Sequence, residues 1–280
     1  MTLRDARTMA LSPAGDAAVL ISGFGQFIFW ERGSLYIGSS VSPSELHSHH
    51  AIQLSLGLQG KVQFKTTMAA DWMEYDGAII PPDMLHTFQA PGRLLAHIFT
   101  EPESQLGRQI LKRFGSGGIV GLSRDEARAL AAPLRAAYLD SAPEDHLIRI
   151  ARQTPARLVG AEEPPDRVDP RIQRAFAEID RRLDEPFTLG EIAAHVGLSE
   201  GRLRHLFVAQ TGLAFRPYVL WARLNRALAL GYSGMSWTEA AHAANFSDSA
   251  HLTRTCRRMF GIAPSSIRDA GRGLSDVATA

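Results

Sequence analysis

Residues 188–212 read TLGEIAAHVGLSEGRLRHLFVAQTG, and residues 236–261 read SWTEAAHAANFSDSAHLTRTCRRMFG. The two stretches share one frame: Glu191 precedes Ser199 by eight residues, and Glu239 precedes Ser247 by eight residues. The sequence therefore repeats a unit of about 48 residues, and a repeat at a fixed period indicates the architecture before any single residue does.

Each copy predicts two short helices joined by a tight turn. Thr188 and Ser236 are good N-caps with a glutamate three residues later, which is the capping-box pattern. The apolar positions that follow have helical spacing, and a glycine or an asparagine then favours a helix end. Ser199 and Ser247 are predicted to cap the second helices. Two helices joined in this way form a helix-turn-helix unit.

The second helix of each copy carries polar groups suited to DNA. Arginine reads guanine edges through paired hydrogen bonds, and serine, threonine and arginine also bind phosphates. Purely structural helical hairpins are the alternative, but chance rarely repeats both a frame and a basic face. We predict base contacts by Arg204, His205, Thr253 and Arg254, phosphate contacts mainly by Ser199, Arg202, Ser247, Arg257 and Arg258, and a place for Ser249 on the same face.

The two copies differ by one residue. Ser199 precedes the first apolar leucine, Leu203, by four residues, whereas Ser247 precedes Leu252 by five residues. We therefore expect the second copy to present its second helix at a different angle. The two units should then read different bases and bind an asymmetric site.

A helix is expected between the copies, over residues 215–231. Pro217 suits the first helical turn, and Gly231 suits the C-terminal stop. Such a helix is about 21–24 Å long at 1.5 Å per residue. Since major-groove faces on one side of DNA repeat every ~34 Å, it could place two helices in successive grooves. One more helix is expected before the first copy, over residues 171–183.

Further patterns accompany the repeat in the same region. They are Leu198-Ser199-x3-Leu203-x3-Phe207-x4-Gly212, Arg223-Leu224-x2-Ala227, Phe246-Ser247-Asp248-Ser249 and Phe260-Gly261-x2-Pro264-Ser265-x2-Arg268. With these patterns, residues from about 170 to 270 resemble the DNA-binding domain of AraC/XylS-type transcription regulators. The resemblance implies a seven-helix domain in which two helix-turn-helix units share a linker helix.

The resemblance also implies which positions read bases. These positions are Gly201, Arg204, His205, Ser249, Ala250, Thr253 and Arg254. Gly201 and Ala250 have no side-chain group that can hydrogen-bond to a base. This chain departs from the family pattern at Asn245, where glycine is usual, and at Cys256, where a large aromatic residue is usual. Cysteine fills less volume, so looser packing is expected in the second unit.

Composition sets broad bounds on the protein. The chain has 280 residues, which is enough for two domains, and 45% of its residues are apolar. Its net charge is +1, divided as +3 from residue 166 onward and −2 before it, so DNA binding would depend on a local arginine face. One cysteine fits a reducing compartment. Without a signal-peptide or membrane-spanning pattern, we expect a cytoplasmic protein with no membrane partner.

The first half of the chain predicts a β-rich domain. Short apolar or alternating runs, broken by glycine, proline and serine, are typical of a sandwich or barrel. These runs are residues 27–30, 35–38, 52–58, 61–65, 77–80 and 94–99, and helices are expected over 103–114, 124–139 and 144–158. The fold class is therefore α+β, with domains at residues 1–160 and 170–280 joined by an acidic, proline-rich linker at residues 161–169.

A histidine pattern stands within the predicted strands. His47-x-His49-x3-Gln53-x6-Gly60 and Pro81-x-Asp83-x2-His86 resemble the two cupin motifs, with Gln53 in place of the usual glutamate and Asp83 in place of glycine. Two histidines at i and i+2 on a strand point the same way. Together with His86, they could hold a divalent metal through their imidazoles, with Gln53 beside them. An effector in place of a metal stays open, and His50 is expected to face solvent.

These observations predict an AraC-type transcriptional regulator that binds double-stranded promoter DNA. Its cupin-like domain would bind a small-molecule effector or set the oligomeric state, a homodimer being one option, and an activator would also contact RNA polymerase. We expect no enzymatic activity. The alternatives are a metal-dependent cupin enzyme, such as a dioxygenase or isomerase with a helical appendage, and a structural repeat scaffold. The sequence leaves open which effector binds, which operator is recognised and whether the protein activates or represses transcription.

Overall fold

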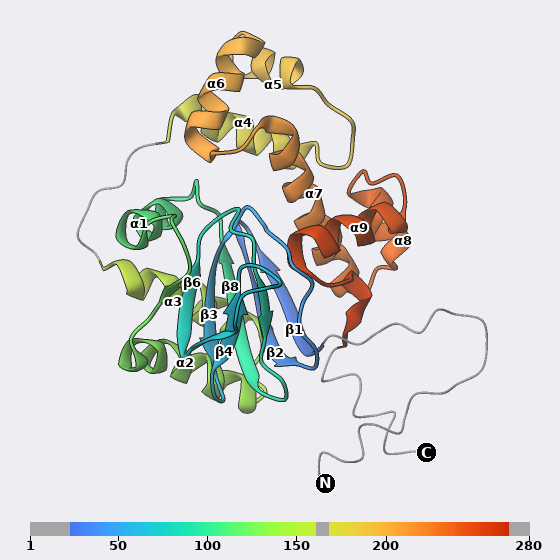
Figure 1. Cartoon of the computed structure of the whole chain (residues 1–280). Coiled ribbons are helices and arrows are strands. Elements are labelled where there is room, and N and C mark those ends of the chain that lie inside the picture. The colour runs from blue at the N-terminus through green and yellow to red at the C-terminus, as the bar shows by residue number, and fades with distance from the viewer. Residues whose placement is uncertain (1–22, 161–167, 269–280) are drawn as a thin grey trace, which may run out of the picture.

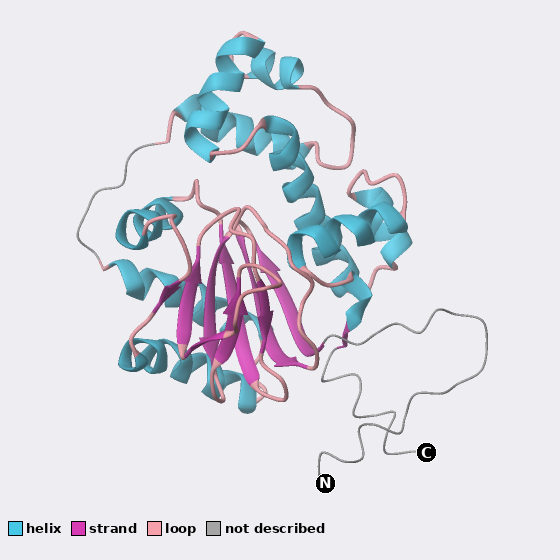
Figure 2. Cartoon of the chain, viewed as in Figure 1, coloured by secondary structure: helices cyan, strands magenta, loops and turns pink. Residues whose placement is uncertain are grey.

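A computed structural model describes residues 23–160 and 168–268, in which a β-rich region with three helices is followed by a set of helices alone (Figures 1 and 2). The strands come first along the chain. They are β1 (Gly23–Trp30), β2 (Gly33–Ser40), β3 (Ile52–Gly57), β4 (Val62–Lys65), β5 (Met73–Tyr75), β6 (Gly77–Ile80), β7 (Thr87–Gln89), β8 (Leu94–Thr100), β9 (Val120–Gly121) and β10 (Ile267–Arg268).

The strands form two sheets. The larger has the order β10-β1-β2-β8-β3-β6-β9, and the smaller has the order β5-β4-β7. All pairs are antiparallel except β1 with β10. The predicted strands are present, but hydrogen bonds do not close them into the predicted barrel over the described residues. Four short strands, β5, β7, β9 and β10, were not predicted, since two or three residues carry no alternation that a sequence pattern could reveal.

Three helices pack on one side of the larger sheet and bury its apolar face. They are α1 (Gln105–Phe114), α2 (Arg124–Leu139) and α3 (Glu144–Val159). Leu35 and Ile98 of the sheet share a core with Ile110, Leu134 and Leu147 of the helices. The predicted bounds hold closely, and serine caps mark the starts of α1 and α2: Ser104 accepts from the Gly107 N–H and Ser123 accepts from the Glu126 N–H.

The remaining helices form the C-terminal part of the structure (Figure 1). They are α4 (Pro170–Arg181), α5 (Leu189–His195), α6 (Glu200–Thr211), α7 (Phe215–Tyr232), α8 (Trp237–Ala243) and α9 (Ser249–Phe260), followed by a 3-10 turn at Pro264–Ser266. We call α5 and α6 the first helix pair and α8 and α9 the second helix pair. The 18-residue α7 joins them and is about 27 Å long at 1.5 Å per residue.

The predicted caps are largely confirmed, with two corrections. Both capping boxes are present at the starts of α5 and α8, and Ser199 caps α6. Asp248, however, caps α9 in place of the predicted Ser247: its carboxylate accepts from the His251 N–H at 2.6 Å. Leu252 therefore follows its cap by four residues, as Leu203 does. The extra residue of the second copy lies in the turn before the helix.

Gly231 is not the end of α7. The helix continues to Tyr232, and Gly234, with φ 110°, is the first glycine beyond it with a left-handed backbone. A Cβ at Gly231 would lie 2.1 Å from the Trp237 ring, so the absence of a side chain allows α8 to approach α7 closely. The left-handed Gly197 (φ 72°) and Asn245 (φ 55°) are found at the turns where helix ends were predicted.

The two halves of the chain are in direct contact. Most of the predicted linker, residues 161–167, lies outside the described residues, so the domain limits stay a prediction. Further along the chain, β10 pairs in parallel with β1 through Gly23 with Ile267 and Phe24 with Arg268. The C-terminal segment thus adds a strand to the N-terminal sheet.

Candidate functional site

The second helix of each pair presents its predicted DNA-contacting residues to solvent. Eight of these ten residues are exposed and not part of a core cluster: Ser199, Arg202, Arg204, His205, Ser247, Arg254, Arg257 and Arg258. Ser249 and Thr253 are half-buried. The apolar face of each helix points inward, with Leu203 and Phe207 of α6 and Leu252 and Cys256 of α9 fully buried. Each helix therefore buries an apolar side, and α9 is clearly amphipathic, with polar side chains available to a partner.

Several of these residues already have partners within the chain. Arg204 forms an ion pair with Glu200, one turn earlier, at 2.5 Å. The Thr253 hydroxyl donates to the Ser249 carbonyl at 2.8 Å. The Ser199 hydroxyl accepts from the Arg202 N–H, which leaves its own proton free to bind a phosphate. The predicted base-reading side chains are thus partly oriented before any ligand is present.

Arg257 is also exposed, but it reaches the other half of the chain. Its Nη1 lies 2.9 Å from Glu45 Oε1, in the loop between β2 and β3. Backbone hydrogen bonds accompany this ion pair: the Glu45 N–H donates to the Gly261 carbonyl at 2.8 Å, and the Ser48 N–H donates to the Arg258 carbonyl at 3.4 Å. No local signal could predict these contacts, because they join residues more than 200 positions apart.

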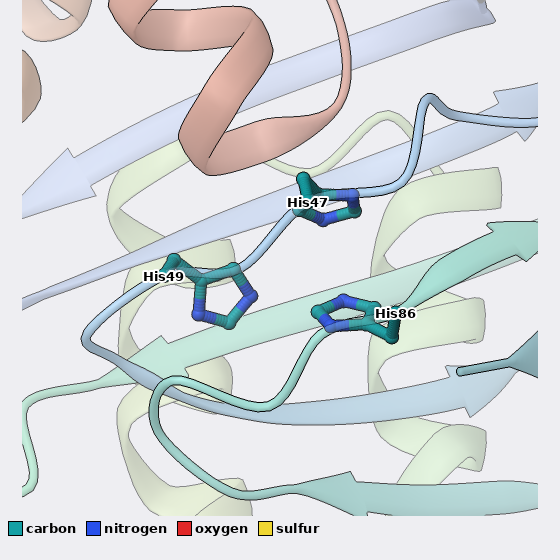
Figure 3. A group of neighbouring side chains, drawn as sticks. All are labelled: His47, His49 and His86. Carbon is teal, nitrogen blue, oxygen red and sulfur yellow. The ribbon is translucent and has the colours of Figure 1, made fainter. Parts of the chain in front are cut away.

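The three cupin-motif histidines come together beneath these contacts. His47, His49 and His86 are buried, and each offers one ring nitrogen within 4.8 Å of the others (Figure 3). The three histidines that the sequence motifs indicated therefore lie together in the structure. The predicted strand position is wrong, because His47 and His86 form only an isolated bridge and His49 lies in the loop before β3.

The backbone orients all three rings in the same way. The Nδ1 atoms of His47, His49 and His86 lie 2.8–2.9 Å from the carbonyls of residues 45, 51 and 84, respectively. A carbonyl only accepts, so Nδ1 of His47 and of His86 carries the proton and Nε2 of each keeps its lone pair. His49 differs, because its Nε2 also lies 2.9 Å from an acceptor, Gln53 Oε1. Burial lowers the pKa of His47 to about 3 and lowers those of His49 and His86, which keeps the rings neutral.

Two of the three imidazoles, those of His47 and His86, have the form that binds a metal ion. Neutral imidazoles whose other nitrogen donates to a backbone carbonyl are the usual protein ligands of zinc and its neighbours. The His86 Nε2 is buried and has no hydrogen-bond partner among the described residues. Gln53 Oε1 lies 2.9 Å from His49 Nε2, and the Gln53 amide nitrogen reaches Ser55 and His97. Gln53 therefore holds His49 in place at the edge of the cluster.

His50 does not face solvent, contrary to the sequence prediction. It is 4% exposed, and its Nε2 lies 2.8 Å from the buried Glu103 carboxylate. Its ring also lies 6.0 Å from Tyr218 of α7. The error has a physical reason: Glu103 follows the end of β8 and reaches His50 from a segment 53 residues away, so local sequence could not show the partner that makes burial of His50 acceptable.

A small cavity of about 30 Å³ adjoins the cluster. His47, Gln53 and His97 line it from the N-terminal half, and Phe260 and Ile262 line it from the C-terminal half. The interior of the β-rich region is therefore partly closed by the segment that follows α9. Any ligand of this interior would contact both halves of the chain.

Known proteins match a part of the C-terminal half. A helix-turn-helix domain family model matches residues 192–270. The chain is 35% identical over 109 residues to the uncharacterized HTH-type transcriptional regulator YidL of Escherichia coli. This alignment covers 39% of the present chain and 36% of YidL. It is 31% identical over 107 residues to the arabinose operon regulatory protein of the same organism, in an alignment that covers 38% of the present chain and 36% of that protein. The match thus spans about a third of each relative.

Solved structures resemble a larger part of the molecule. ToxT from Vibrio cholerae aligns over 83% of this chain and 95% of its own length, with a TM-score of 0.52 and 10% sequence identity. A ToxT structure with a bound unsaturated fatty acid aligns equally well, with a TM-score of 0.52. At this identity the likeness concerns the fold alone. Over the described residues, no helix combines the length and apolar character needed to cross a membrane.

Proposed function

We propose, from the AraC-type helix-turn-helix domain that this chain carries, that the protein is a sequence-specific DNA-binding transcriptional regulator. One observation supports this function above the others. The second helices of two similarly capped helix pairs both expose arginine on the side away from their cores, and a single rigid helix joins the two pairs.

Each helix pair acts as one helix-turn-helix unit in this proposal. α6 and α9 enter successive major grooves, with α7 setting their separation. Arg204, His205, Thr253 and Arg254 contact base edges, and Ser249 lies beside them. Ser199, Arg202, Ser247, Arg257 and Arg258 contact phosphates. The additional residue lies in the turn of the second unit, so the two units approach their half-sites differently and an asymmetric site is expected.

The N-terminal region acts as the regulatory domain. Its folded sheets would form a cupin-like frame for a small-molecule effector, as the fatty-acid-bound form of ToxT suggests for a protein of similar fold. Contacts with RNA polymerase for an activator, a homodimer and a cytoplasmic location belong to the same proposal. The alternative of a metal-dependent cupin enzyme finds no support in the relatives, which are named as transcriptional regulators.

The test uses the purified full-length chain. Selection of binding sites from random duplex DNA, followed by gel-shift measurements, should yield one preferred sequence. Arg254→Ala should weaken binding to that sequence by roughly 1–3 kcal/mol. Arg152→Ala, which removes an exposed arginine of α3 far from the helix pairs, is the matched control. Failure to enrich any sequence, or equal losses for the two variants, would refute the proposal.

A further inference from the structure

We propose that the cleft between the β1–β2 turn and helices α4 and α7, which we call the α7 cleft, binds a small organic carboxylate with an apolar body. The cleft has a volume of about 410 Å³, within the usual range for small-molecule sites. It is separate from the cavity beside His47, with which it shares one lining residue, Phe99. The inference rests on the proposed function, because it assigns a ligand class and a place to the effector.

Helix α7 provides two hydrogen-bond donors that have no partner. Trp221 is 3% exposed, and its indole N–H has no acceptor among the described residues. Arg226 is half-buried, and its Nε is also buried without an acceptor in the described part of the chain. Both residues line the α7 cleft. A buried donor without an acceptor costs free energy, and a carboxylate, which only accepts, can satisfy such donors.

The charges around the α7 cleft leave one cation uncompensated. Arg32 is paired, since it lies 3.3 Å from the Glu101 carboxylate and 3.9 Å from that of Glu31. Arg226 forms no hydrogen bond or ion pair with any residue that the structure describes. The remaining acid of the lining, Asp180, is exposed to solvent, which screens its charge. A ligand with one negative charge therefore has its counter-ion in Arg226, whose guanidinium can hold a carboxylate through two parallel hydrogen bonds.

The apolar walls of the α7 cleft determine the rest of the ligand. They come from both halves of the chain and include Phe29, Trp30, Phe99 and Leu183. Aromatic walls of this kind bind apolar bodies, and flat rings in particular, through offset or edge-to-face contacts. A carboxylate attached to a small aromatic or aliphatic group matches this combination of one cation and apolar walls.

The position of the α7 cleft suits an effector because it adjoins the packing of both helix pairs. Leu183 belongs to the core of the first pair. The Trp221 ring lies 5.6 Å from the Phe260 ring at the end of α9, within the core of the second pair. A ligand that contacts Leu183 and Trp221 together therefore acts on the supports of both pairs, and its occupancy is coupled to how α6 and α9 are held.

Ligand binding is measured with the full-length chain and phenylacetate. The chain has four tryptophans, so its nitrogen–proton NMR spectrum should show four indole signals. The signal that Trp221→Phe removes should shift saturably on titration, whereas that of Trp72, which does not line the cleft, should stay in place. Uncharged phenylacetamide and cationic phenethylamine should bind at least about tenfold more weakly. Absence of a shift with phenylacetate, or equal binding of the amine, overturns the proposal.

A pair of variants then tests the role of the unpaired arginine. Arg226→Gln retains an amide donor but loses the charge, so phenylacetate affinity should fall about tenfold or more. Arg216→Gln, at the exposed start of the same helix and outside the cleft, is the matched control and should bind as the wild type does. Circular dichroism verifies that both variants are folded, and equal affinities of the two refute the assignment. A chain that selects no DNA sequence refutes the proposed function, while the phenylacetate titration still decides the cleft.

Discussion

The two helix pairs share an internal design but differ in what they pack against. The core of the first pair consists of residues from α4, α5, α6 and the first half of α7, with Phe207 at its centre. The core of the second pair includes Ala51 and Phe99 of the N-terminal half, together with Trp221 and Phe260. In Figure 1 the first pair lies above the sheet, at the top of the view, and the second pair lies beside β1. Repeated sequence thus produces similar units in unequal surroundings.

The contacts with the N-terminal half differ in chemistry as well. On the side of the first pair a charged group is involved: Arg32 of the N-terminal half lies over the Phe176 ring at 5.1 Å, and it also pairs with Glu101 of its own half at 3.3 Å. On the side of the second pair the buried contacts are aromatic, with the Phe27 and Phe260 rings 5.8 Å apart, and the ion pair of Arg257 with Glu45 is exposed. Apolar contacts depend little on pH, whereas buried charges depend on it strongly. The difference predicts that the two pairs detach from the sheet under different conditions.

The largest expected effect is the loss of a core ring. Phe207→Ala and Phe260→Ala should each cost about 3–5 kcal/mol of unfolding free energy. Phe207 contacts Phe176 and Tyr218, so hydrogen exchange should rise in α4–α7 alone. Phe260 contacts Phe27 and Phe99, so exchange should rise in β1 and β8 as well as α9. Identical hydrogen-exchange maps for the two variants would show that the two helix pairs do not differ in their packing against the N-terminal half.

The next effect concerns pH. Burial, with the nearby Glu103 charge second, raises the pKa of Glu101 from its ordinary value of 4.5 to about 8, against the opposing effect of Arg32. A folded-state pKa above the unfolded one contributes stability that is complete at low pH and is lost as pH rises from about 4.5 through about 8. The loss should reach a few kcal/mol, since each pKa unit corresponds to about 1.4 kcal/mol.

Urea unfolding of the wild type and of Glu101→Gln across this pH range measures the effect. The glutamine has no charge to lose, so the variant should keep its stability where that of the wild type falls. Parallel pH profiles for the two chains would contradict the assignment.

A smaller effect compares the two DNA-binding faces. Arg254→Ala should cost roughly 1–3 kcal/mol of binding free energy at the preferred sequence. Arg204→Ala should cost less by about 0.3–0.5 kcal/mol, the usual value of an i,i+4 ion pair, because Arg204 must first leave Glu200. Fluorescence anisotropy with labelled duplexes resolves this difference. A larger loss at Arg204 would mean that Glu200 orients it for DNA.

The smallest effect distinguishes the caps. Asp248→Ala and Ser199→Ala should each reduce stability by about 1 kcal/mol, since each removes the acceptor for the first turn of its helix. Ser247→Ala is the matched control and should be nearly neutral, because Ser247 caps no helix. Thermal unfolding measures all three. A loss at Ser247 equal to that at Asp248 would restore the cap that the sequence pattern suggested.

The sequence predicted most of the features whose causes are local. Capping residues located the helix bounds, and the spacing of His47, His49 and His86 indicated a cluster, although its metal and DNA contacts stay predictions. The burial of His50, the pairing of Arg257 with Glu45 and the pairing of β10 with β1 have partners far away in sequence. No local pattern encodes them. The choice of Asp248 over Ser247 is a different case, because both are good caps and only the helix register decides.

The strand β10 has a consequence for solubility. A sheet edge presents unpaired amide and carbonyl groups to which a foreign strand can add. On the β1 side, β10 covers the first residues of that edge, and it comes from the end of the proposed DNA-binding domain. A chain cut just before Ile267 would leave Gly23 and Phe24 as open backbone beside the exposed Phe24 ring. Shortened versions of this protein should therefore self-associate, whereas chains that retain β10 carry their own protective strand.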